Sequence, residues 1–182
     1  MHRIYPQIEL TNEMVIAAKE LIQHVRVDRT VASTIDTLTG ILGEIAFAQY
    51  LFGDWRKHRV GSNKGDVDFT DIEVKTSAFP FRESLNLLVR EDYAAKRKPK
   101  FYVQVIINVT SDKADDIKPG TEALICGFAG SQEVDRAPKR DFGSKIACKG
   151  GYACHHIPIT SLHPMEEFQA AYHRRRIDTK TP

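Results

Sequence analysis

Apolar side chains recur at helical spacing in two stretches near the N-terminus, and this pattern predicts two amphipathic helices. The first follows Thr11, whose hydroxyl suits a helix N-cap, and runs toward the charged stretch RVDR at 26–29. The second begins near Ser33, because STID has the form of a capping box, and it ends at Gly53. The apolar positions of the two stripes are Met14, Val15, Ala18, Leu21, Ile22 and Val25 in the first helix, and Ile35, Leu38, Leu42, Ile45 and Phe52 in the second.

After the second helix the pattern changes to short apolar and β-branched runs, which predict strands. Segment 101–109, FYVQVIINV, is apolar almost without interruption, as is typical of a strand buried on both faces of a sheet. We therefore expect α/β layering, with helices on each side of the sheet. The predicted strands are 55–60, 66–69, 72–78, 85–89, 101–109 and 122–128, with a short helix in REDYAAKRK at 90–98 and a closing helix over about 160–175.

Composition narrows the class of protein. The chain has 182 residues, of which 42% are hydrophobic and 27% charged, as in ordinary soluble globular proteins. No linker rich in Pro, Gly or Ser divides it, so one domain over 1–182 is expected. No apolar run reaches the roughly 18 residues that span a bilayer, and MHRIYPQIEL lacks the apolar core of a signal peptide. These features predict a cytoplasmic protein.

The three cysteines are an odd and small number, which favours reduced thiols over a disulfide scaffold. Cys148, Cys154, His155 and His156 lie close together in CKGGYACHH. A hairpin that carries them could bind zinc, but their spacing matches no common structural zinc pattern. The favoured interpretation is strand residues around a Gly-Gly turn.

The net charge of +2 says little about partners, whereas the distribution of basic residues says more. Each basic cluster, taken singly, could be an ordinary solvated face, while together they could line a track for phosphates. The clusters are WRKHR at 55–59, AKRKPK at 95–100, APKRDFGSK at 137–145 and HRRR at 173–176.

An unusual concentration of acidic residues occurs in GDVDFTDIEVKTS at 65–77. In an extended strand Glu73 and Lys75 share one face, because side chains alternate. If Thr70-Asp71 is a two-residue hairpin loop, Asp68 pairs directly with Glu73 on that face, and Asp66 joins it at a greater distance. Neighbouring carboxylates repel one another when no cation lies between them, and together they can bind a hard divalent cation. The segment therefore predicts a Mg²⁺ site.

An acidic residue followed two positions later by Lys occurs three times in the chain, so spacing alone is weak evidence. Asp116-Ile117-Lys118 runs into Pro-Gly, and Asp178-Thr179-Lys180 lies in a polar tail. Only Glu73-Val74-Lys75 has a strand context and a nearby acid on a helix. That acid is Glu44, at the border of the second apolar stripe, where the flanking Gly40 and Gly43 would let the helix approach a sheet closely.

A helix containing LGEIAFAQYL, an Asp-hydrophobic pair, a short turn and IEVKTS together resemble the PD-(D/E)XK nuclease superfamily, over about residues 33–128. The resemblance implies a restriction-endonuclease-like fold, a central mixed β-sheet flanked by helices. It implies Asp68, Glu73 and Glu44 as metal ligands and Lys75 as the catalytic lysine, with Gln104 in a supporting role. The sequence departs from the family pattern in having Val67, not Pro, before Asp68, so Asp66 remains an alternative ligand.

The resemblance implies a Mg²⁺-dependent DNA endonuclease, with Mn²⁺ as a substitute metal, acting as a homodimer because cleavage of both strands usually needs two sites. One alternative is a nucleic-acid-binding module of the same fold without turnover. Another is a structural sheet domain whose acids are fortuitous. Recognition specificity and biological role cannot be read from the fold.

Overall fold

A four-stranded sheet, called sheet A, lies at the centre of this computed structural model, which describes residues 3–25, 34–61, 67–96, 98–141 and 153–172. Its strands, in spatial order, are β1 (Gln7–Glu9), β5 (Glu122–Gly130), β4 (Phe101–Ile107) and β2 (Ile72–Ala78). Strands β2 and β4 are parallel, whereas β4 and β1 each pair with β5 in antiparallel fashion. The expectation of a mixed sheet is confirmed.

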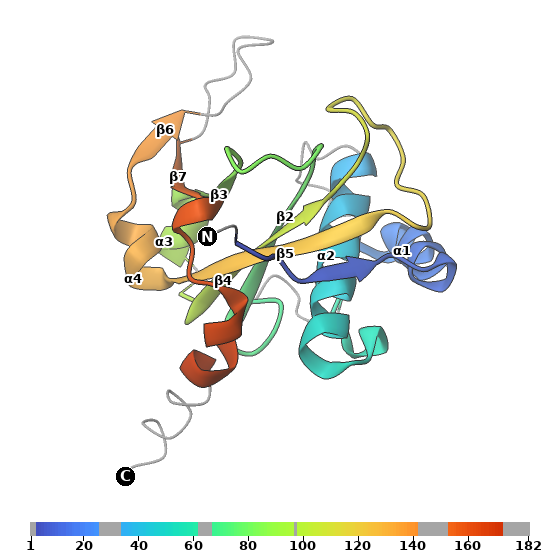
Figure 1. The fold of residues 1–182 in the computed structure, drawn as a ribbon, viewed down its shortest axis with the longest axis horizontal. Helices are drawn as coiled ribbons and strands as arrows, with labels where there is room; N and C mark the ends of the chain where they lie inside the picture. Colours follow the sequence, from blue (N-terminus) through green and yellow to red (C-terminus); the bar gives the residue numbers. More distant parts are fainter. Residues whose placement is uncertain (1–2, 26–33, 62–66, 97, 142–152, 173–182) are drawn as a thin grey trace.

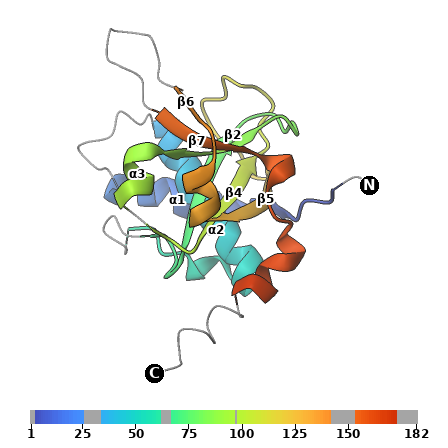
Figure 2. The ribbon, with the colours of Figure 1, turned by 90° about the vertical axis from the view of Figure 1, so that its left-hand side faces the viewer.

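A smaller antiparallel sheet, sheet B, lies beside sheet A (Figure 1). It has the order β3 (Asn86–Arg90), β7 (Ala153–Pro158) and β6 (Lys139–Asp141). The short helices α3 (Glu91–Lys96) and α4 (Ser131–Arg136) follow β3 and β5. Two long helices, α1 (Asn12–Val25) and α2 (Thr34–Phe52), lie on the opposite side of sheet A from sheet B (Figures 1 and 2).

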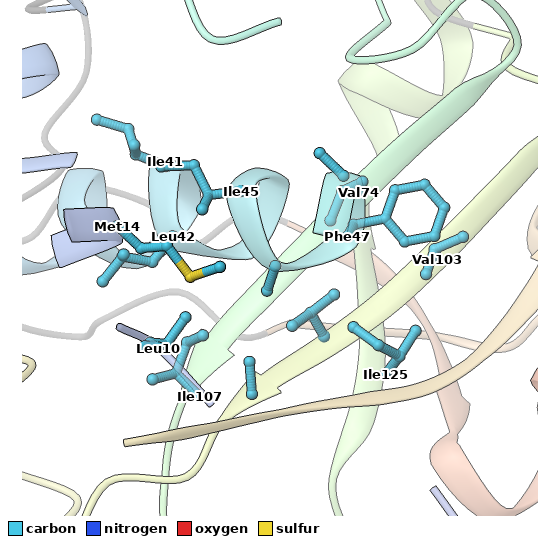
Figure 3. Packing of buried hydrophobic residues seen from close by; sticks show 14 of the residues in the cluster. Leu10, Met14, Ile41, Leu42, Ile45, Phe47, Val74, Val103, Ile107 and Ile125 are labelled. Atoms are coloured by element: carbon cyan, nitrogen blue, oxygen red, sulfur yellow. The ribbon is translucent and has the colours of Figure 1, made fainter. Parts of the chain in front are cut away.

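Strand β4 is buried at all seven positions, as its continuous apolar sequence predicts. One of its faces joins a core cluster with α1 and α2, and Figure 3 shows Phe47 of α2 turned toward Val74 and Val103 of the sheet. The other face joins a second cluster that includes Leu87 and Val89 of β3. The expectation of helices on each side is therefore only half correct, because a strand and short helices cover the second face.

The predicted ends of the long helices agree with the structure where it describes them. Thr11 accepts the first bond of α1, with its Oγ1 3.3 Å from the Met14 amide nitrogen. Gly53 ends α2 in a left-handed conformation, φ 67°, and its N–H donates to the carbonyl oxygen of Gln49. Ser33 and the stretch 26–29 lie outside the described residues.

Close packing of α2 on β2 depends on Gly43. A Cβ atom at this position would lie 1.8 Å from Oγ1 of Thr76, so only glycine permits the contact without movement. Gly40 has nothing within 4 Å of such an atom, so its predicted role in helix approach is wrong. The predicted apolar stripe of α2 is also too narrow, since a continuous buried run from Ile45 to Ala48 extends beyond it, while Phe52, which the stripe included, is 45% exposed.

Three predicted elements differ from the structure. Segment 55–60 is not a strand: it begins with the 3₁₀ turn η1 (Trp55–Lys57), because Asp54 caps it. In the described part of 66–69, only an isolated bridge from Phe69 to Ile72 is present. The closing helix of 160–175 is divided into the 3₁₀ turns η2 (Ile159–Ser161) and η3 (Met165–Glu167) and a helical segment at 168–172, since Pro164 separates the two turns.

Within the residues that the structure describes, no helix is long and apolar enough to cross a membrane.

Candidate active site

The two-residue turn predicted before β2 is present. Phe69 and Ile72 exchange backbone hydrogen bonds across Thr70-Asp71, and the amide nitrogen of Phe69 lies 2.9 Å from the carbonyl oxygen of Ile72. The Asp71 carboxylate binds Lys100 at 3.1 Å, at the end of the loop before β4. This turn returns the chain so that Asp68 lies against β2.

Asp68 contacts β2 in a way that the sequence did not predict. Its Oδ2 accepts a hydrogen bond of 2.7 Å from the backbone N–H of Val74, between Glu73 and Lys75. The Phe69–Ile72 bridge has the predicted register, while the described residues of this turn form no further bridge, so the direct pairing of Asp68 with Glu73 stays a prediction. The carboxylate is nevertheless held at the strand that carries the other candidate residues.

Glu73 and Lys75 form an ion pair on the face of β2 opposite to Ile72 and Val74, because side chains alternate along a strand. The distance from Lys75 Nζ to Glu73 Oε1 is 2.7 Å, and the side chains are 24% and 5% exposed, respectively. Lys75 is also the register partner of Gln104 on β4. The Gln104 amide is buried and donates to the carbonyl oxygen of Val105 at 2.9 Å, so its supporting role remains a prediction.

Glu44 reaches the same group of charges from α2. Its pKa is raised to about 9, first by burial and then by the negative charges of Asp68 and Glu73, while Lys75 acts in the opposite direction. Its Oε2 is buried and makes no hydrogen bond. The neighbouring Gly43 packs directly on β2, so the close helix approach brings Glu44 to the acids.

The donor chemistry of this group fits a hard divalent cation such as Mg²⁺. The negative charges of Asp68 and Glu73 act on Glu44, and a buried oxygen of Glu44 makes no hydrogen bond, so a cation would relieve both the repulsion and the desolvation. In the described part of the chain no three His, Cys, Asp or Glu side chains are already arranged to hold a metal ion. Asp66, the alternative ligand, lies outside the described residues.

An aromatic side chain that sequence analysis did not single out also borders the site. Tyr93 lies on α3, and Lys75 Nζ is 5.8 Å from its ring centroid. The guanidinium carbon of Arg90 lies 4.8 Å from the same centroid. No local motif marks this contact, because it depends on how β3 and α3 pack beside β2.

The basic clusters are largely paired with acids where the structure describes them. Lys98 binds Asp135 at 2.8 Å, Lys139 binds Glu91, and Arg56 binds Glu13 at 3.1 Å. These pairs are exposed, and exposed pairs contribute little stability and exchange readily. Segment 173–176 lies outside the described residues, and a phosphate track remains a prediction.

The Cys-His segment has the strand character that was favoured over zinc binding, as far as it is described. Cys154 is a buried free thiol whose pKa burial raises. His155 lies with it on β7, and its Nδ1 is 3.3 Å from the carbonyl oxygen of Ala137. Cys148 and the Gly-Gly turn lie outside the described residues.

Comparison with known proteins adds no assignment. No family model matches the chain, and no match was found among curated proteins or among solved structures. The resemblance to the PD-(D/E)XK nucleases therefore remains a prediction from the sequence.

Proposed function

We propose that the chain is a Mg²⁺-dependent endonuclease that hydrolyses phosphodiester bonds of DNA, with the restriction-endonuclease-like fold. The observation that carries the proposal is Glu44, a partly buried residue whose Oε2 is buried without a hydrogen bond and whose pKa is raised to about 9 by burial and by the charges of Asp68 and Glu73. Burying neighbouring acids is costly, and in proteins such groups are concentrated at metal and catalytic sites. The alternative of a structural sheet domain whose acids are fortuitous does not explain why the chain would bring these acidic groups together at such a free-energy cost.

Each residue has a definite role in the proposed reaction. Glu44, Asp68 and Glu73 would hold the cation, and Mn²⁺ would substitute because it also prefers octahedral oxygen ligands. Bound Mg²⁺ supplies Lewis acidity, which lowers the pKa of water and offsets negative charge on a phosphate. The Lys75 ammonium, which is bonded to Glu73 and partly exposed, would donate hydrogen bonds to the attacking water or to the phosphate.

A homodimer and a cytoplasmic location belong to the same proposal. One acidic centre per chain cuts one strand at a time, so cleavage of both strands favours two copies. Sedimentation of the purified chain with and without DNA would measure this association.

The decisive experiment incubates the purified full chain with supercoiled, linear, single-stranded and branched DNA. Nicking or cutting is expected in Mg²⁺ and in Mn²⁺, whereas Ca²⁺ should support binding alone because its coordination is looser and larger. Glu73→Gln and Lys75→Gln should each abolish cleavage. The matched controls Glu122→Gln and Lys118→Gln remove exposed charges and should cut at the parent rate.

Binding of DNA without cleavage in any metal would reject the nuclease and favour the alternative, a nucleic-acid-binding module of the same fold. Equal cleavage by the parent and by Glu73→Gln would reject the assigned residues.

A further inference from the structure

Directly after α2 the chain presents aromatic and cationic side chains together at the surface. Among the described residues, Phe52 is one of four large apolar side chains that are substantially exposed, at 45%. Lys57 Nζ lies 5.7 Å from the centroid of its ring, and the guanidinium carbon of Arg56 lies 4.6 Å from that of Trp55. We call Phe52, Arg56 and Lys57 the platform, with Trp55 behind the guanidinium group.

Local hydrogen bonds fix the backbone of the segment that carries the platform. The side-chain Oε1 of Gln49 accepts from the N–H of Trp55 at 3.1 Å, and Oδ1 of Asp54 accepts from the N–H of Arg56 at 3.1 Å. The left-handed Gly53 makes the turn between them possible. A ligand would therefore meet a preorganised backbone, which lowers the entropic cost of binding.

The charge of this surface favours an anionic partner. Arg56, Lys57 and Arg59 are exposed cations, whereas burial lowers the pKa of His58 and so disfavours its charged form. The ion pair between Arg56 and Glu13 is exposed, with 64% and 71% of the two side chains accessible, so an incoming phosphate can compete for the arginine.

The platform adjoins the candidate active site. The ring centroid of Phe52 is 6.1 Å from that of Phe69, which is the residue after Asp68. A chain of nucleotides lying on the platform would therefore approach the acidic centre from the Asp68 side.

We propose that the platform binds an unpaired strand of DNA, with a base stacked on the partly exposed ring of Phe52 and phosphates against Arg56 and Lys57. Stacking on a protein side chain requires a base whose face is open, and in a duplex both faces are covered by neighbouring base pairs. The choice of DNA as the nucleic acid rests on the proposed function. The stacking and charge geometry does not depend on it.

The chain contains a single tryptophan, Trp55, so its fluorescence reports on the platform directly. The full chain is titrated without metal, in chelator, with an oligothymidylate of about 12 nucleotides and with a duplex of equal length. We expect the single strand to change the Trp55 emission saturably and the duplex to bind more weakly. Omitting metal separates this test from the proposed function, because cleavage takes no part in it.

Variants then assign the contacts. Phe52→Ala should weaken single-strand affinity about 5- to 150-fold, as the loss of one stacked base predicts, and Phe52→Tyr should retain it. Phe79→Ala is the matched control and should bind like the parent, because among the described phenylalanines Phe79 is also substantially exposed, at 37%. Lys57→Ala should reduce the slope of log affinity against log salt by about 0.7, whereas Lys113→Ala should not.

The proposal is overturned if Phe52→Ala, shown to be folded by its thermal melt, binds the single strand within twofold of the parent. It is equally overturned if the duplex binds as tightly as the single strand. A parent protein that binds the single strand but cuts no DNA in Mg²⁺ or Mn²⁺ would count against the acidic centre and leave the platform standing.

Discussion

The two sides of strand β2 are buried to similar degrees and differ completely in chemistry. Toward α2, Ile72 and Val74 are core residues, and Thr76 touches Gly43. On the other side Glu73 is as deeply buried as these apolar neighbours, yet it is charged and paired with Lys75. Burial alone therefore does not distinguish the side that stabilises the fold from the side that carries the proposed chemistry.

The difference has an energetic basis. Apolar burial contributes to stability, whereas a cluster of buried acids opposes it unless a cation or a protein partner compensates. Substitutions on the α2 side should therefore change the free energy of unfolding, and substitutions on the charged side should change metal binding and activity. The following experiments test this separation in order of expected effect.

Phe47→Ala should have the largest effect on stability. Phe47 is fully buried in the α2-side core, and its ring contacts those of Phe69 and Phe168. Removing it should lower the free energy of unfolding by about 3–5 kcal/mol, as measured by urea denaturation. Phe79→Ala is the control, with an expected loss under about 0.5 kcal/mol. A comparably small loss for Phe47→Ala would mean that this side is not the stabilising one.

Addition of Mg²⁺ should stabilise the parent protein through the charged side. At about 100 times its dissociation constant, a ligand specific for the folded state contributes about 2.7 kcal/mol. Glu44→Gln should lose this stabilisation, because it removes the carboxylate whose buried oxygen makes no hydrogen bond. Glu20→Gln on α1 should keep the stabilisation. Thermal melts with and without Mg²⁺ measure both. If Glu44→Gln gains as much as the parent, Glu44 is not a ligand.

Gly43→Ala should affect both sides of β2 at once. The added methyl group meets Thr76, and overpacking of this kind costs about 1–3 kcal/mol of unfolding free energy. Because Glu44 is the next residue, the same displacement should also weaken the Mg²⁺-dependent stabilisation. Gly40→Ala, which meets nothing, is the control. A Gly43→Ala variant that melts and binds metal like the parent would disprove the close contact.

Tyr93→Ala should have the smallest effect. The interaction of a lysine with an aromatic face is worth about 0.5–2 kcal/mol, so loosening Lys75 should slow cleavage about 2- to 30-fold. Tyr93→Phe retains the ring and should retain the rate. In both variants Mg²⁺ should raise the melting temperature by as much as it does in the parent. A slow Tyr93→Phe would assign the effect to the hydroxyl group instead.

Sequence periodicity predicted the elements whose buried positions follow a regular pattern along the chain. The helical stripes anticipated α1 and α2, and the continuous apolar run anticipated β4, because each pattern follows directly from local geometry. The association of Glu73 with Lys75 was equally accessible, since alternation along a strand determines it. Glu44 was identified only as a border residue, and its depth depends on the Gly43 contact.

The remaining features depend on partners that lie far away in the sequence. Strands β1 and β6 have three residues each and are defined by their pairing with β5 and β7. The turn η1 replaces a predicted strand because Gln49 and Asp54 capture backbone N–H groups. Asp68 accepts a hydrogen bond from the backbone N–H of Val74, a contact that strand alternation does not encode.

That last hydrogen bond also bears on how the chain stays separate from its own copies. Strand β2 is at the edge of sheet A, and an uncapped edge N–H is a template for another strand. Asp68 occupies the N–H of Val74 and adds a negative charge there. Loss of this side chain would therefore expose the edge to intermolecular pairing, so aggregation of Asp68→Ala would report on this protection, and Asp68→Asn, which keeps an acceptor oxygen, is the variant that isolates the loss of charge.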